Sequence, residues 1–123
     1  MSEPEQMPID RPLLRVQDVR AHSRYEARLG ADPELAALLD YRPSETWIAL
    51  LHTEVQPGFQ GQGIASQLAR WVFDDARSRG LKILPKCPFI VRWLERHPEQ
   101  HDVLLRPLGS SPPPNAESPL EPA

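Results

Sequence analysis

The feature that most constrains this chain is an apolar run over residues 47–55 that leads through a glycine-rich turn into a long amphipathic segment. The run is continuously apolar up to His52, which is typical of a strand covered on both faces. Beyond the turn, Ile64, Leu68 and Val72 recur every four residues and mark the buried stripe of a helix. The segment is therefore predicted to form a strand, a turn and a helix in that order.

The turn has the sequence Gln60-Gly61-Gln62-Gly63-Ile64-Ala65. Its two glycines lack a Cβ atom, so they can adopt positive φ and let a ligand approach the main chain closely. The first N–H groups of a helix have no internal acceptor and lie at the positive end of the helix dipole. These amides favour a phosphate or pyrophosphate, although the spacing alone fits an ordinary connection between a strand and a helix equally well.

Two common nucleotide motifs are excluded by the residues that follow the turn. A Walker loop needs a Lys-Ser/Thr pair after its last glycine, whereas Gly63 is followed by Ile64 and Ala65. The dinucleotide fingerprint requires a third glycine, and this chain has Ser66 there. The sequence therefore supports neither ATP hydrolysis nor NAD binding.

The loop Gln60-x-x-Gly63-x-Ala65 resembles the Arg/Gln-x-x-Gly-x-Gly/Ala pyrophosphate loop of the GNAT acyltransferases, the superfamily of N-acetyltransferases that use acetyl-CoA. Three further motifs resemble a short, single-domain branch of that superfamily and extend the similarity over residues 25–104. They are His52-Thr53-Glu54-Val55, Pro85-x-Cys87-Pro88-Phe89 and Arg96-His97-Pro98. The resemblance implies a minimal α/β fold of the α+β type, with a mixed, partly antiparallel sheet and two main helices.

The resemblance also implies where acetyl-CoA, the co-substrate, binds. In this superfamily the strand before the loop and the strand after the helix diverge, and the pantetheine lies in the gap against the backbone of the first strand. Carried onto this sequence, Val55 is the main-chain partner of the pantetheine. The residues that would hold the pyrophosphate are Gln60, Gly61, Gln62, Gly63, Ile64 and Ala65. The backbone groups of the two strands are then expected to be unpaired near Val55, because the ligand replaces the ladder.

Two candidate catalytic side chains, His52 and Glu54, alternate along the predicted strand and therefore share one of its faces. An amine must lose a proton during acyl transfer, and a carboxylate or imidazole whose pKa is shifted by partial burial can accept it. Glu54 is the first candidate for this base, with His52 orienting it. The alternatives are a structural polar pair at a strand end and, for His52, a satisfied core histidine.

Cys87, the one cysteine of the chain, precedes Pro88, a residue suited to the first position of a helix. At a helix N-cap the dipole stabilises a thiolate, and the resemblance places this strand end beside the acyl pocket. Cys87 is thus a candidate for a covalent acetyl-cysteine step. The alternatives are a small buried hydrophobe and direct attack of the amine on acetyl-CoA, which needs no cysteine.

A single cysteine also excludes an internal disulfide and suits a reducing, cytoplasmic compartment.

No metal site is expected from the histidines. His97 and His101 are four residues apart, but Pro98 breaks the helix that would place them on one face. A packing or capping role is the better interpretation of His97.

Shorter patterns predict the remaining elements. Residues 23–29 fit a half-exposed strand. Capping residues at positions 32–34 favour a helix over residues 35–41, whereas the resemblance favours a strand there, and a strand is predicted. Residues 81–84 are predicted to be a short strand, and Pro88 is predicted to begin a second helix.

Two glycines mark the ends of predicted elements. Gly80 is predicted to end the long helix as a C-cap glycine does. Only residues 30–34, which begin with Gly30, separate the first two predicted strands. The helices that usually grip the substrate in this superfamily are therefore expected to be missing, and the acceptor side is expected to be open.

The two ends of the chain differ from its middle in composition. Residues 1–12 hold three prolines and residues 107–123 hold six. Such segments bury too little apolar area to offset their ordering entropy, so both are predicted to be disordered tails around a folded domain at residues 13–106. Each tail carries a charge of −2, which leaves +1 of the net charge of −3 on the domain.

A nearly neutral domain offers no electrostatic argument for binding nucleic acid or a membrane, and no apolar run approaches the ~18 residues of a membrane span.

The leading hypothesis is a cytoplasmic acetyl-CoA-dependent N-acetyltransferase that modifies a primary amine of a small molecule or a protein. A non-catalytic CoA-binding module is the alternative, and the prolines at positions 112–114 suggest, as a third interpretation, a ligand for a proline-recognising partner. The sequence leaves the oligomeric state open.

Overall fold

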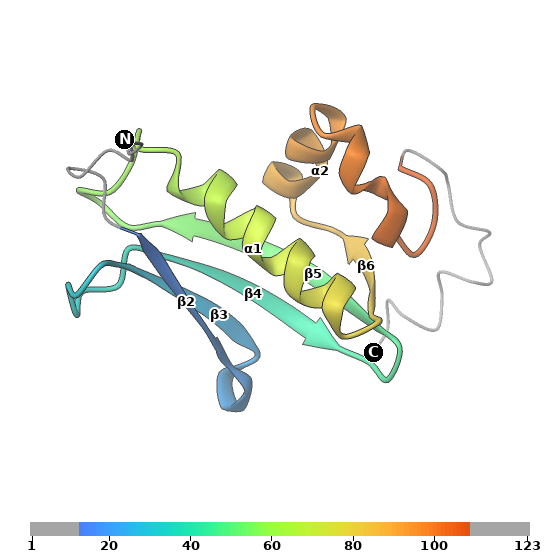
Figure 1. Ribbon diagram of the computed structural model, residues 1–123, viewed down its shortest axis with the longest axis horizontal. Helices are drawn as coiled ribbons and strands as arrows, with labels where there is room; N and C mark the ends of the chain where they lie inside the picture. Colours follow the sequence, from blue (N-terminus) through green and yellow to red (C-terminus); the bar gives the residue numbers. More distant parts are fainter. Residues whose placement is uncertain (1–12, 109–123) are drawn as a thin grey trace, which may run out of the picture.

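The computed structural model of the chain describes residues 13–108, which form a five-stranded sheet with helices packed on it (Figure 1). The strands are β2 (Leu14–Val19), β3 (Arg24–Leu29), β4 (Ala37–Pro43), β5 (Trp47–Val55) and β6 (Lys82–Pro85). The α-helices are α1 (Ile64–Ser78) and α2 (Pro88–Glu95), and the 3₁₀ helices are η1 (Arg20–His22) and η2 (Pro98–Val103).

The strands lie in the order β2-β3-β4-β5-β6. The first four are antiparallel neighbours, whereas β5 and β6 are parallel and are joined by the glycine loop and α1. A parallel pair needs such a crossover, which is usually a helix. The predicted mixed, partly antiparallel sheet of an α+β fold is therefore confirmed.

Most of the predicted elements are present. The apolar run forms β5 over the predicted residues, and α1 begins directly after Gly63. Gly80, with φ of 71°, follows the last turn of α1 as predicted. The second helix begins at Pro88, with Cys87 at its N-cap in an extended conformation. Local sequence patterns therefore located the crossover and the start of α2 correctly.

The segment that could have been a helix is the strand β4. Asp32 lies in the connection that precedes β4, and its carboxylate accepts a hydrogen bond from the Glu34 N–H at 2.9 Å. Asp32 therefore closes a tight turn and does not begin a helix. Beyond the turn, Ala37, Leu39 and Tyr41 alternate along β4 and are buried against the core.

The strand β2 was not predicted, and it changes which strands come first. β2 pairs with β3, and the connection between them is the single turn η1 followed by Ser23, in the left-handed region with φ of 51°. Residues 30–36 connect β3 to β4, so the short connection noted in the sequence joins the second and third strands that the structure describes. Within residues 13–108, no α-helix lies between β2 and β3.

The core lies between α1 and one face of the sheet, across which α1 runs in Figure 1. The apolar stripe of α1 is fully buried there, and it consists of Ile64, Leu68, Ala69, Val72, Phe73 and Ala76. Near the end of α1, Tyr25 of β3 donates a hydrogen bond to Asp75 at 3.3 Å, and Arg79 contacts the same carboxylate at 2.9 Å. The far end of α1 is thereby tied to the sheet by polar contacts as well as by packing.

A second tyrosine joins this polar cluster. The Tyr41 hydroxyl donates to the Asp18 carboxylate of β2 at 2.6 Å. Burial, and then the hydrogen bond to Asp18, raise the pKa of Tyr41 to about 12. Burial and the nearby Asp75 carboxylate also raise the pKa of Tyr25. Both phenols are therefore neutral in the folded protein at physiological pH.

The predicted tails at residues 1–12 and 109–123 lie outside the described residues. At the C-terminal side, the structure describes two residues beyond the expected domain end at Arg106, and Leu108 packs against the core.

Candidate functional site

The glycine loop between β5 and α1 is an open turn built on three residues with positive φ. Gly58, Gly61 and Gly63 have φ of 91°, 79° and 73°. A Cβ atom added at Gly61 or Gly63 would meet no atom within 4 Å. The main chain of the loop therefore faces free space, which a ligand can enter.

The backbone amides at the start of α1 directly follow this open turn. The first backbone hydrogen bond of the helix runs from the Gln67 N–H to the Gly63 carbonyl at 3.1 Å. The preceding amides, from Ile64 to Ser66, belong to the first turn, where a helix supplies no acceptor. Their N–H groups and the helix dipole together provide the donors that a pyrophosphate requires.

Two glutamine side chains brace the loop. Gln60 Nε2 donates to the Val55 carbonyl at 3.3 Å, and Gln62 Nε2 donates to the Gly58 carbonyl at 3.4 Å. The first contact links the loop directly to the last residue of β5. The loop residues and Val55, which the resemblance assigned to two parts of one ligand, are therefore neighbours.

The two parallel strands diverge beside this loop. Pairing between β5 and β6 ends at Leu50 and Pro85. The N–H groups of Lys86 and Cys87 then both donate to the Leu50 carbonyl, at 2.9 and 3.0 Å, where the chain turns into α2. β5 continues to Val55 while pairing with β4 on its other edge. Among the described residues 13–108, residues 51–55 therefore have no strand partner on the β6 side, as the resemblance implied.

A β-bulge lies where this divergence begins. Asp40 pairs with His52 and Tyr41 pairs with Leu50, so Leu51 is an extra residue on β5. A bulge bends its strand and changes which way the following side chains point. The bulge at Leu51 therefore determines on which face of the sheet the side chains of residues 52–54 lie.

Thr53 points toward the core side of the sheet and contacts Cys87. It pairs with Leu39, which pairs with Tyr25, and cross-strand partners share a face. Thr53 Oγ1 lies 3.3 Å from Cys87 Sγ. Cys87 is 3% exposed, and its side chain makes no capping hydrogen bond to α2. Thr53 was not among the residues singled out in the sequence.

His52 and Glu54 lie on the opposite face of β5, next to each other. His52 Nε2 is 3.4 Å from Glu54 Oε1, so the two share a face as predicted. Their side chains are 59% and 52% exposed, which is more than the partial burial invoked for the proposed base. Gln56 also donates to Glu54, at 3.4 Å. The structure thus separates the predicted residues into a pair on the open face and a cysteine on the core side.

The helix α2 is docked onto the loop end of α1 by Trp93. The indole Nε1 donates to Ser66 Oγ in the first turn of α1 at 2.8 Å, and the ring packs at 5.2 Å from Phe73. Arg70 of α1 lies 5.8 Å from the centre of the same ring. These contacts hold α2, whose N-cap is Cys87, against the helix that follows the glycine loop.

The two histidines after α2 satisfy its last carbonyl groups. His97 Nδ1 is 2.8 Å from the Trp93 carbonyl, with its ring stacked on Trp93, and His101 Nε2 is 2.8 Å from the Leu94 carbonyl. These are the packing and capping contacts expected for His97. Among residues 13–108, no three His, Cys, Asp or Glu side chains converge to hold a metal ion.

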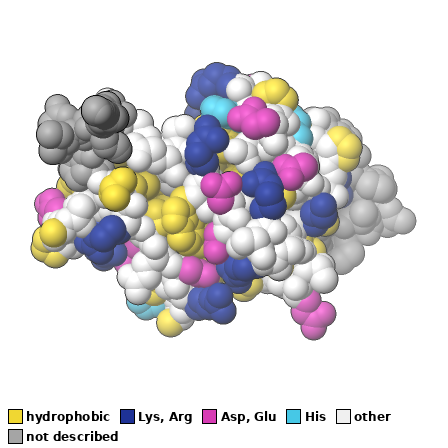
Figure 2. All heavy atoms as spheres, viewed as in Figure 1, with side chains coloured by type: hydrophobic (Ala, Val, Ile, Leu, Met, Phe, Trp, Pro, Cys, Tyr) yellow, Lys and Arg dark blue, Asp and Glu magenta, His cyan; other side chains and the backbone are white. Residues whose placement is uncertain are grey.

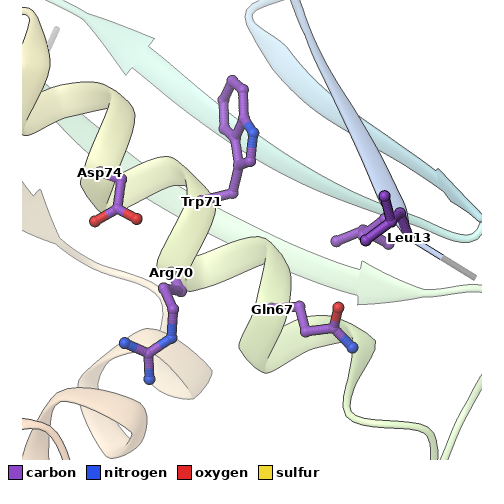
Figure 3. Close-up of a pocket in the computed structure, with 6 residues that line it drawn as sticks. Leu13, Gln67, Arg70, Trp71 and Asp74 are labelled. Carbon is purple, nitrogen blue, oxygen red and sulfur yellow. The ribbon is translucent and has the colours of Figure 1, made fainter. Parts of the chain in front are cut away.

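A separate hollow of about 270 Å³ lies between α1 and the first residues of β2 (Figure 3). It is lined by Leu13, Leu14, Gln67, Arg70, Trp71 and Asp74. Two of its charged groups already have partners, because Asp74 is paired with Arg77 at 3.1 Å and Arg70 lies over Trp93. Both charged side chains that line the hollow are therefore already engaged within the protein.

One face of the protein carries charged side chains of both signs (Figure 2). On the face drawn in Figure 2, basic and acidic side chains lie interspersed. None of the helices between residues 13 and 108 is both long and apolar enough to span a bilayer.

Comparison with known proteins agrees with this geometry. The sequence model of the GCN5-related N-acetyl-transferase family matches residues 24–103. Protein NATD1 of Xenopus tropicalis is 31% identical over 85 residues, which cover 69% of this chain and 78% of that relative. Protein NATD1 of Homo sapiens is 29% identical over 85 residues, which cover 69% of this chain and 75% of that relative.

A solved structure is similar in fold as well as in sequence. The NMR solution structure of a GCN5-like protein from Staphylococcus aureus superposes with a TM-score of 0.57 and 29% identity. The match covers 75% of this chain and 88% of the other chain.

Proposed function

Because this chain belongs to the GCN5-related N-acetyltransferase family, we propose that it binds acetyl-CoA and transfers the acetyl group to a primary amine of a small molecule or a protein. The observation that carries the proposal is the open turn at Gly61 and Gly63, where an added Cβ atom meets nothing within 4 Å, directly before the positive end of α1. Beside it, residues 51–55 of β5 offer an edge that pairs with no strand on the β6 side in the part of the chain that the structure describes. A diphosphate and an extended amide chain have complementary partners in these two features.

The residues fit a ligand of this kind on chemical grounds. Coenzyme A combines a diphosphate with pantetheine, whose amide groups can pair with main-chain groups as a strand does. The free amides of the loop would hold the diphosphate, and the edge of β5 near Val55 would pair with the pantetheine. When bound, the coenzyme supplies a thioester whose acetyl carbon is open to nucleophilic attack.

Glu54 is proposed as the base that takes the proton from the attacking amine. Its carboxylate lies on the open face of β5, with His52 at 3.4 Å to orient it. The face is accessible, since the His52 and Glu54 side chains are 59% and 52% exposed. An acceptor amine, whether free or on a protein chain, can therefore approach Glu54 from solvent.

Cys87 is proposed to act by a second route, in which the acetyl group passes through its thiol before reaching the amine. The two routes use opposite faces of β5, because Cys87 contacts Thr53 while Glu54 contacts His52. No hydrogen bond links Cys87 to Glu54 within the described residues. The thiol and the carboxylate therefore act as separate groups rather than as one dyad.

The proposal is tested by incubating the full chain with acetyl-CoA and a panel of primary amines, then measuring released coenzyme A by chromatography. Turnover with at least one amine is expected, and Glu54→Gln should lower kcat. Glu45→Gln is the matched control, since Glu45 is exposed on the turn between β4 and β5, and it should leave kcat unchanged. Binding without turnover on any amine would instead favour a non-catalytic CoA-binding module.

A further inference from the structure

The Thr53 hydroxyl is the polar side-chain group that touches the one cysteine of the chain. Its Oγ1 lies 3.3 Å from Cys87 Sγ, which is within hydrogen-bonding distance for sulfur. Among residues 13–108, no other side chain forms a hydrogen bond to this thiol. The contact joins two elements that are 34 residues apart in the sequence.

The backbone fixes both partners of this contact. Cys87 is held by its N–H, which donates to the Leu50 carbonyl of β5 at 3.0 Å, and by its place at the N-cap of α2. Thr53 is held by the pairing of β5 with Leu39 of β4. The main chain of both residues is thus fixed, and the hydroxyl contacts a thiol that is 3% exposed.

The contact also lies at the place where the proposed co-substrate binds. Thr53 is one of the residues of β5 that pair with no strand on the β6 side within residues 13–108. Cys87 follows β6 directly, where the two strands separate. A thioester lying in this gap would therefore pass the Thr53 and Cys87 side chains.

We propose that Thr53 is a positioning residue for Cys87, holding its sulfur toward the unpaired edge of β5 and stabilising the negative charge that forms on it. This inference rests on the proposed function. In the step it serves, the Cys87 sulfur bonds to the acetyl carbon and the bond from that carbon to the coenzyme sulfur breaks. The thiol proton ends on the departing coenzyme A. The Thr53 hydroxyl donates a hydrogen bond to the Cys87 sulfur while this proton leaves.

The hydrogen bond itself can be tested without any substrate. Because the chain has a single cysteine, its S–H stretching band in the infrared spectrum belongs to Cys87, and Cys87→Ala should remove it. Thr53→Val keeps the side-chain shape and removes the hydroxyl, so the band should shift. Thr53→Ser keeps the hydroxyl and should restore the wild-type position. An unchanged band in Thr53→Val overturns the proposed contact.

The role in transfer is tested by intact-mass measurement of the protein after exposure to acetyl-CoA. Thr53→Val should slow acetylation of Cys87 about tenfold, the rate equivalent of one lost hydrogen bond, and should displace its pH profile. Thr53→Ser should recover most of the rate, while affinity for coenzyme A stays the same in both variants. Equal rates and pH profiles in wild type and Thr53→Val overturn the positioning role.

Failure of this inference is distinguishable from failure of the proposed function. A wild-type protein that binds acetyl-CoA but never carries an acetyl group on Cys87 overturns the role of Thr53 in transfer and leaves direct attack with Glu54 intact. A wild-type protein that does not bind acetyl-CoA overturns the proposed function itself.

Discussion

Two glycines at opposite ends of α1 allow the loop's role in binding to be separated from its role in folding. Gly63 precedes the helix with φ of 73°, and Gly80 follows it with φ of 71°. An added Cβ would meet nothing within 4 Å at either position. The two sites thus place the same conformational demand on a side chain, but Gly63 alone belongs to the proposed binding loop.

Replacing either glycine by alanine should destabilise the protein by a similar amount. Forcing an L-residue into the left-handed region costs about 1–2 kcal/mol, and the open space around both sites adds no steric penalty. For a domain of this size, each variant should lower Tm by roughly 4–8 °C for every 1 kcal/mol lost. Urea denaturation of Gly63→Ala and Gly80→Ala measures the two losses directly.

Coenzyme A binding should respond to only one of the two sites. A side chain at Gly63 stands between the ligand and the first amides of α1, so Gly63→Leu should abolish the heat of coenzyme A binding in calorimetry. Gly80→Leu should bind like the wild type at the same temperature. If Gly63→Leu binds with unchanged affinity, or if the two alanine variants differ by more than ~1 kcal/mol in stability, the reasoning is refuted.

Two further predictions concern the contacts that fix α1. Because the folded pKa of Tyr41 is raised to about 12 from its ordinary value of 10 and that of Tyr25 is raised too, their stabilisation is full below pH 10 and is lost as the pH rises through the folded values. The absorbance of tyrosinate at 295 nm in the native protein should therefore stay low at pH 10. A complete rise in this absorbance around pH 10 would contradict the raised pKa values of the two tyrosines. For Trp93→Phe and Ser66→Ala, the double-mutant cycle should show a coupling of about 1 kcal/mol. Strict additivity would rule out the indole hydrogen bond seen at 2.8 Å.

Local sequence patterns predicted the crossover because residues close together in the sequence specify each of its elements. The four-residue repeat of α1 and the continuous apolar run of β5 each lie within one element, and Gly80 and Pro88 end or begin helices through their own backbone geometry. β2 was missed because one of its inward-facing positions holds a polar residue, Asp18. That carboxylate is satisfied by Tyr41 of β4 and by Arg79, which lies 61 residues away. No local pattern shows such partners.

The parts of the candidate site that depend on local spacing in the sequence were predictable as well. The glycine loop and the shared face of His52 and Glu54 followed from spacing along one strand. The contact of Thr53 with Cys87 depends on how the start of α2 packs against β5, and the bulge at Leu51 sets which residues of β5 face it. The useful indication was the position of Thr53 between two candidate residues, where alternation places it on the other face.

The central claim is that main-chain amides at the start of α1 bind the diphosphate of coenzyme A, and an NMR titration of the ¹⁵N-labelled protein tests it most directly. At ~1 mM coenzyme A, even a binding free energy of about −4 kcal/mol would half-fill the site. The account predicts saturable shifts centred on the amides of Gly61, Gly63, Ile64 and Ala65, with smaller shifts along the end of β5. Unchanged loop amides at that concentration, or shifts confined to another part of the protein, would contradict it.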